Sequence, residues 1–144
     1  MTPVLLALAV TVAAPAPKEA KKDPPSVLGE WLIESTTLNG APLPGGPVVT
    51  VVYTADGKSE TRREGGAIVQ SGTYTLDPKK EPAEVDLTSA PPAAGTWKGI
   101  YRLDGDTLTV CVTTSSSARP TSFEGKAGSG YIVTVYRRVP KKKE

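Results

Sequence analysis

Short runs in which hydrophobic and polar residues alternate dominate the chain from Val27 onward. A period of two residues is typical of β-strands that bury one face against a core. No stretch between Val27 and Val139 keeps an apolar period of 3.6 residues, so long amphipathic helices are not expected. The strands predicted from the alternation span residues 28–38, 48–54, 58–64, 67–76, 83–88, 97–103, 107–113 and 131–139.

Turn-forming dipeptides separate these runs. Asn39-Gly40 and Asp56-Gly57 both favour positive φ, and we expect a type I′ hairpin turn at the second. Asp104-Gly105-Asp106 joins two runs of clear alternation, with Gly105 supplying the positive φ. Turn signals at intervals of roughly 8–12 residues are expected of a sandwich or an up-and-down barrel.

The alternation also predicts which side chains face the core. We expect Tyr101 and Leu103 to meet the apolar residues of the following run across the hairpin, namely Leu108, Val110 and Val112. In the run 67–76 one parity is shared by Ile68, Gln70, Gly72, Tyr74 and Leu76. Those residues are therefore expected to point to the same side of the sheet.

About eight strands can close into a barrel, which removes the exposed edges that invite aggregation. The prolines of this part of the chain all fall in inferred loops or at strand starts. We therefore predict an all-β fold, a single antiparallel barrel of about eight strands, with a β-sandwich as the alternative.

The N-terminal residues have the character of a targeting segment. Residues 4–14 are apolar but too few for a transmembrane span, which needs about 20 residues. Small residues follow, so residues 1–16 are predicted to be a signal peptide and the protein to be exported to the periplasm, cell envelope or exterior. A Pro- and Lys-rich linker over 17–26, a β domain over 27–139 and a basic tail over 140–144 complete the chain.

Composition narrows the chemistry. The 144 residues include no His and one Cys, Cys111, so a Cys–His pair, an internal disulfide and a Cys-based zinc site are excluded. The formal net charge of +2 is too small to indicate nucleic-acid binding. No catalytic residue, cofactor or metal is expected, and we predict that the protein is not an enzyme.

An ordered set of motifs resembles a known family. It comprises Gly29-Glu30-Trp31, Tyr74-Thr75-Leu76-Asp77-Pro78, Val85-Asp86-Leu87-Thr88, Gly99 to Leu108, Cys111, Arg119 to Phe123 and Gly128-Ser129-Gly130. Together these residues resemble an uncharacterised family of small, often exported domains that is abundant in Planctomycetes and lipocalin-like in character. The resemblance covers about residues 27–139 and implies a lipocalin-like barrel and export, but no activity.

Three features are candidate sites. Cys111 has the parity opposite to its apolar neighbours, and we expect it to pack as a small hydrophobe. Arg119, beside the rigid Pro120, could clamp a carboxylate or phosphate, or it could anchor its loop to carbonyls or to Asp104 or Asp106. A calcium site built from Asp77, Asp86, Asp104 and Asp106 is disfavoured, because their spacing lacks ligands at alternate positions.

Aromatic residues could line a cavity, since a barrel of this size can hold one small ligand. The candidate ligand-binding residues are Trp31, Tyr74, Tyr101 and Arg119. The sequence therefore predicts a non-catalytic module that binds a small apolar or anionic ligand. The alternative is a structural or protein-interaction module of the cell envelope, with a filled core and an envelope protein as partner.

Overall fold

The computed structural model describes residues 26–44, 49–91, 94–113 and 118–140. Within these ranges the protein is all-β and has no helix. The predicted signal peptide, 1–16, lies outside the described residues, as does the predicted linker, 17–26, except for Ser26. The strands are β1 (Gly29–Leu38), β2 (Ala41–Pro42), β3 (Val49–Tyr53), β4 (Lys58–Arg63), β5 (Ile68–Asp77), β6 (Glu84–Ser89), β7 (Gly95–Asp104), β8 (Thr107–Thr113) and β9 (Tyr131–Arg138).

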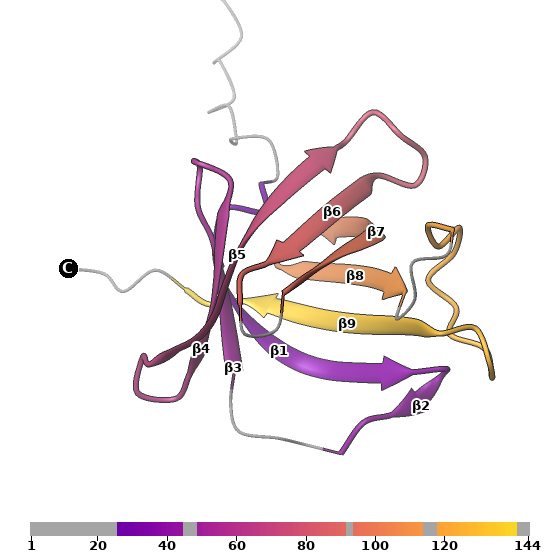
Figure 1. The fold of residues 1–144 in the computed structure, drawn as a ribbon, viewed down its shortest axis with the longest axis horizontal. Coiled ribbons are helices and arrows are strands. Elements are labelled where there is room, and N and C mark those ends of the chain that lie inside the picture. Colours follow the sequence, from indigo (N-terminus) through magenta and orange to yellow (C-terminus); the bar gives the residue numbers. More distant parts are fainter. Residues whose placement is uncertain (1–25, 45–48, 92–93, 114–117, 141–144) are drawn as a thin grey trace, which may run out of the picture.

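Eight of these strands form a closed antiparallel barrel (Figure 1). Neighbouring strands pair in chain order from β3 to β9, and β1 closes the barrel by pairing with β3 on one side and β9 on the other. The predicted barrel is confirmed, and the alternative sandwich is not adopted. The two-residue strand β2, which the sequence pattern missed, pairs only with the end of β1.

Two of the three expected turns are confirmed. Asn39 and Gly40 have φ of 54° and 82°, and they join β1 to β2. Gly105 has a φ of 57° between the paired residues Asp104 and Thr107. Positive φ at these positions suits a glycine or an asparagine.

The type I′ turn predicted at Asp56-Gly57 is wrong. Only Gly57 has a positive φ, and four residues separate β3 from β4. The Thr54 hydroxyl contacts the Asp56 carboxylate and the Lys58 carbonyl, while Gly57 N donates to Thr54 O. These side-chain bonds favour the four-residue loop over the two-residue turn, and the Asp56-Gly57 dipeptide alone does not predict them.

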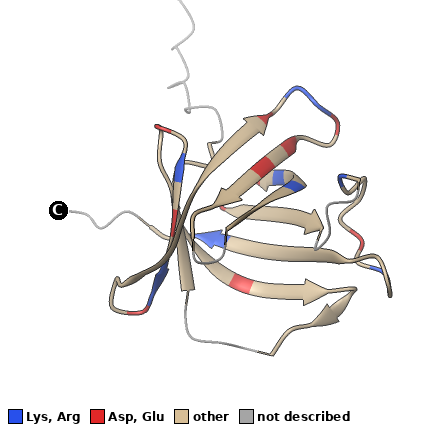
Figure 2. Cartoon of the chain, in the orientation of Figure 1, with Lys and Arg blue, Asp and Glu red and all other residues tan. Residues whose placement is uncertain are grey.

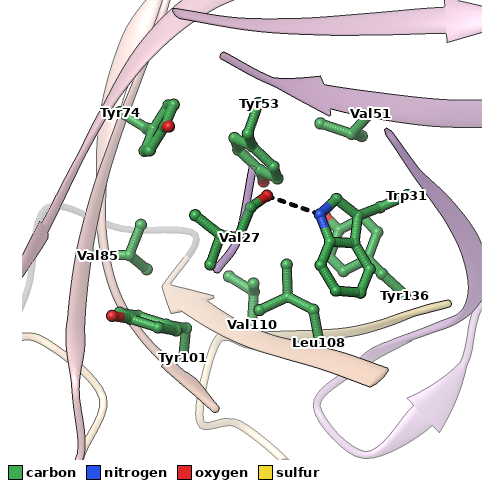
Figure 3. Packing of buried hydrophobic residues seen from close by; sticks show 10 residues of the cluster. All are labelled: Val27, Trp31, Val51, Tyr53, Tyr74, Val85, Tyr101, Leu108, Val110 and Tyr136. Atoms are coloured by element: carbon green, nitrogen blue, oxygen red, sulfur yellow. Dashed lines mark hydrogen bonds between the residues drawn. The ribbon is translucent and has the colours of Figure 1, made fainter. Parts of the chain in front are cut away.

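The inward faces of the strands fill the barrel (Figure 3). The predicted hairpin register is confirmed, because Tyr101 pairs with Val110 and Leu103 with Leu108. The buried hydrophobic cluster consists of Val27, Trp31, Val51, Tyr53, Tyr74, Val85, Tyr101, Leu108, Val110 and Tyr136.

Ile68 does not point to the same side of the sheet as Tyr74, although their shared parity predicted this. The pairing register of β4 with β5 shifts between Thr61 and Arg62, so that Arg62 pairs with Ile68. Ile68 is 53% exposed as a result. An irregularity of this kind inserts a residue into one strand and reverses the side-chain parity beyond it.

Candidate functional site

Trp31 belongs to the hydrophobic core and is fully buried. Its Nε1 donates a hydrogen bond of 2.8 Å to the Val27 carbonyl (Figure 3). The Arg138 guanidinium stacks on the ring at 4.2 Å from its centroid. A buried indole N–H needs such an acceptor, so this geometry suits a structural anchor of the barrel.

Tyr74 and Tyr101 line the residual space inside the barrel, together with Val27, Tyr53, Leu76, Val85, Leu108 and Val110. That space measures about 10 Å³. A single water needs roughly 10–15 Å³ and pockets for drug-sized ligands measure roughly 300–1,000 Å³, so the space between these described residues is too small for a ligand of that size. Burial raises the pKa of both tyrosine hydroxyls above their ordinary value of 10.0.

Arg119 lies on the outer wall of the barrel, away from these aromatic residues. Its Nη1 donates to the carbonyls of Val85 (3.1 Å) and Gly99 (2.8 Å). Its Nε lies 3.2 Å from Glu84 Oε1, and its Nη2 lies 2.7 Å from Asp86 Oδ1. The contact with Asp86 is an ion pair by distance but lies outside hydrogen-bond geometry.

Arg119 therefore ties the loop before β9 to β6 and β7, which is the anchoring role considered from the sequence. The carboxylates that it uses are Glu84 and Asp86, whereas Asp104 or Asp106 had been expected. Asp106 instead faces Arg138 Nε at 3.5 Å. The sequence places Arg119 closer to the 104–106 turn, but the pairing of β6 with β7 and of β7 with β8 brings β6 beneath the loop.

We expect Arg119→Ala to lower the free energy of unfolding by about 2–3 kcal/mol, since it leaves two carboxylates and two carbonyls without their cationic partner. Arg119→Lys should recover less than half of the loss, because an ammonium lacks the planar fork that reaches several acceptors. Urea denaturation of the three proteins checks this. Equal stability of the lysine variant and the wild type would contradict the multidentate anchor.

A groove lies on the outer wall between the β5–β6 connection and the Arg119 loop. We call it the outer-wall groove. Its main part has a volume of about 300 Å³ and is lined by Lys80, Glu81, Pro82, Glu84, Ile100, Arg119, Pro120 and Thr121. A second part of about 270 Å³ shares Lys80, Glu81 and Pro82, and adds Phe123 and Arg102. A third part of about 150 Å³ shares Glu84 and Arg119. The shared residues show that the three parts are neighbours on the outer wall.

The groove combines a rigid apolar floor with charges of both signs. Pro120 is fully buried, and Arg102 stacks on the Phe123 ring at 4.9 Å. Acidic residues mark β6 and the end of β5, next to the lysines of the β5–β6 connection (Figure 2). An apolar centre with a polar rim resembles the anatomy of protein–protein interfaces more than that of an enclosed ligand pocket.

Cys111 packs as predicted. It is fully buried on the outward-facing side of β8, where it pairs with Ile100 of β7. Burial raises the pKa of its thiol from 9.0 to about 11. The thiolate, which is the nucleophilic form, is therefore scarce at neutral pH.

This raised pKa predicts a loss of stability at high pH. The folded protein holds the Cys111 proton more tightly than the unfolded chain, so the contribution of this thiol is complete below pH 9 and is lost as the pH rises towards 11. Urea denaturation across this range measures the effect, and Cys111→Ala should make the decline less steep. An identical decline in both proteins would contradict the prediction.

The four aspartates considered for calcium do not meet. Asp104 and Asp106 are exposed at the β7–β8 turn, whereas Asp77 and Asp86 lie on β5 and β6. Among the residues that the structure describes, no group of three or more His, Cys, Asp or Glu side chains could hold a metal ion.

Reasoning from sequence missed two contributors to the geometry. Arg138 binds the carbonyls of Ser26 and Leu28, and Val27 packs in the core, but neither residue stands in a motif that singles it out.

The described part of the chain contains no helix that is long and apolar enough to cross a membrane. No protein-family model matches the chain, and no curated protein is significantly similar to it.

Proposed function

We propose that this chain is an exported, non-catalytic binding domain that recognises a segment of another cell-envelope protein in its outer-wall groove. One contrast carries the proposal. The space inside the barrel is about 10 Å³, whereas the main part of the groove alone offers about 300 Å³. In this conformation the outer-wall groove therefore offers more space for a bound partner than the interior of the barrel does.

The chemistry of the groove supports a protein segment as the occupant. Pro82 gives rigid apolar contact surface above the buried Pro120, while Lys80 and Glu81 offer opposite charges at the rim. Arg119 is already held by Glu84 and Asp86, so its main role is to shape the groove and not to capture an anion. A main part of about 300 Å³ is at the lower end for small-molecule sites but can take a few side chains of a peptide.

Two further parts of the proposal come from the sequence. Export rests on the apolar residues 4–14 and the small residues that follow them. The absence of catalysis rests on a chain without His, whose single Cys is buried and protonated at neutral pH.

Site-specific photo-crosslinking in the native host tests the proposal. A photoreactive amino acid at Thr121, which lines the groove, should give one defined adduct with an envelope protein. The same group at Ala67, which is exposed in the β4–β5 connection, should not give it. Exchanging the rim charges with Lys80→Glu and Glu81→Lys should weaken the adduct at least about five-fold.

The partner found in this way is then purified and its affinity measured by calorimetry, with the charge-exchanged protein as the control. Adducts of equal yield from Thr121 and Ala67, or no adduct from either, would reject the groove as the contact site. N-terminal sequencing of the protein recovered from the envelope tests export. A chain that still begins at Met1 would reject the predicted cleavage.

A further inference from the structure

Val27 fills the middle of the barrel although it belongs to no strand. It precedes β1, yet it is only 7% exposed and packs among core residues of several strands. Figure 3 shows its side chain pointing between Tyr53, Val85 and Val110. Its neighbours Ser26 and Leu28 are both exposed. One side chain of an otherwise superficial segment is thus inserted into the interior.

Side chains hold this segment in place. The carbonyl of Val27 accepts from Trp31 Nε1. The carbonyls of Ser26 and Leu28 accept from Arg138, at 2.6 Å from Nη2 and 2.9 Å from Nη1. None of the three residues belongs to a β-ladder, so the segment can leave while the strand pairing of the barrel stays intact.

A glycine follows the segment directly. Gly29, the first residue of β1, has a φ of 113°, a conformation that other residues rarely adopt. The backbone therefore changes direction between Val27 and the sheet at a residue with wide conformational freedom. Such a position suits a hinge about which 26–28 can swing away from the barrel.

The space that Val27 would vacate adjoins the residual cavity. The cavity of about 10 Å³ is bounded by Val27 itself and by seven strand residues, Tyr53, Tyr74, Leu76, Val85, Tyr101, Leu108 and Val110. Departure of the Val27 side chain would join the volume that it occupies to this space. An apolar cavity of about 150 Å³ holds a benzene-sized molecule.

We propose that residues 26–28 are a displaceable plug, and that the barrel holds a latent site for a small, uncharged, apolar ligand which binds in place of Val27. The walls of that site are aliphatic side chains and tyrosine rings. The Tyr74 hydroxyl is already committed to the Thr54 carbonyl at 2.7 Å. A charged ligand would lose its hydration there without a partner. This site lies inside the barrel, although Leu76 and Tyr101 also line parts of the outer-wall groove, and its test does not depend on the function proposed for the groove.

Toluene serves as the probe, and the full-length mature protein is observed by methyl NMR. The Val27 methyl groups, which lie beside aromatic rings, should have signals displaced from their unfolded positions. Added toluene should move these signals back towards the unfolded positions, while the signals of Val51, which does not line the cavity, stay in place. Toluene that perturbs Val85 or Val110 with Val27 still inserted would overturn the plug, as would an unchanged spectrum at the solubility limit.

A matched pair of variants separates plug release from simple cavity creation. Val27→Ala removes part of the plug and should raise the affinity for toluene about ten-fold or more. In the wild type the ligand must displace the Val27 side chain, which is inserted most of the time, whereas the smaller alanine competes less. Val51→Ala removes the same two methyl groups from a strand of the wall, away from the cavity lining. It should leave the affinity unchanged. Equal gains in both variants would overturn the proposal.

Discussion

Replacing Trp31 with alanine is expected to lower the free energy of unfolding by about 3–5 kcal/mol, which is a large part of the stability of a small domain. The change empties a fully buried position of the core. It also removes the hydrogen bond to the Val27 carbonyl and the ring on which Arg138 stacks. Urea or thermal denaturation of the purified variant measures the loss.

Trp97→Ala is the matched control, because it deletes the same side chain from a partly exposed position on β7. Less apolar surface is buried there, so we expect a loss below half of that at Trp31. Equal losses at the two tryptophans would contradict the central role assigned to Trp31. Trp31→Phe should fall between wild type and alanine, since it keeps a ring but not the N–H donor.

Replacing Gly72 with alanine is expected to cost about 3 kcal/mol although it adds only one methyl group. A Cβ at this position would lie 2.1 Å from the backbone carbonyl oxygen of Thr88. Gly72 pairs with Ser89 at the end of the β5–β6 ladder, so the clash is with backbone and not with a mobile side chain. The two strands must separate locally to relieve it.

Gly65→Ala separates this steric effect from the general cost of replacing glycine. Gly65 has a φ of 92°, but a Cβ there would meet nothing within 4 Å. Its substitution should cost about 1 kcal/mol from backbone strain alone. Chemical denaturation of both variants makes the comparison, and a loss at Gly65 as large as that at Gly72 would contradict the proposed clash.

The sequence determined the features that depend on neighbouring residues. Alternation of apolar and polar residues placed eight strands within one or two residues of their observed bounds. It also predicted that Tyr101 and Leu103 meet the apolar residues of β8. The Asn39-Gly40 dipeptide specified its turn through a local preference for positive φ. The burial of Cys111 followed from its residue type and its place in a strand.

Tertiary structure decided the features that depend on residues far apart in the chain. The carboxylates that Arg119 contacts lie more than thirty positions away, and only the pairing of β6 with β7 and of β7 with β8 brings Glu84 and Asp86 beneath its loop. Ile68 points outward because the register between β4 and β5 is irregular, and a strict period of two residues does not predict such an irregularity.

The state of the interior was likewise a matter of three-dimensional packing. Aromatic residues that could line a cavity could equally fill one, and the volume left between them depends on how side chains from all strands interlock. The insertion of Val27 decided the outcome, because a residue outside every strand occupies the middle of the barrel. Its place depends on carbonyl contacts with Trp31 and with Arg138, a residue more than one hundred positions away. Local sequence patterns therefore determine the eight barrel strands and two of the three predicted turns, whereas the filling of the barrel and the shape of its outer wall arise from contacts that exist only once the chain has folded.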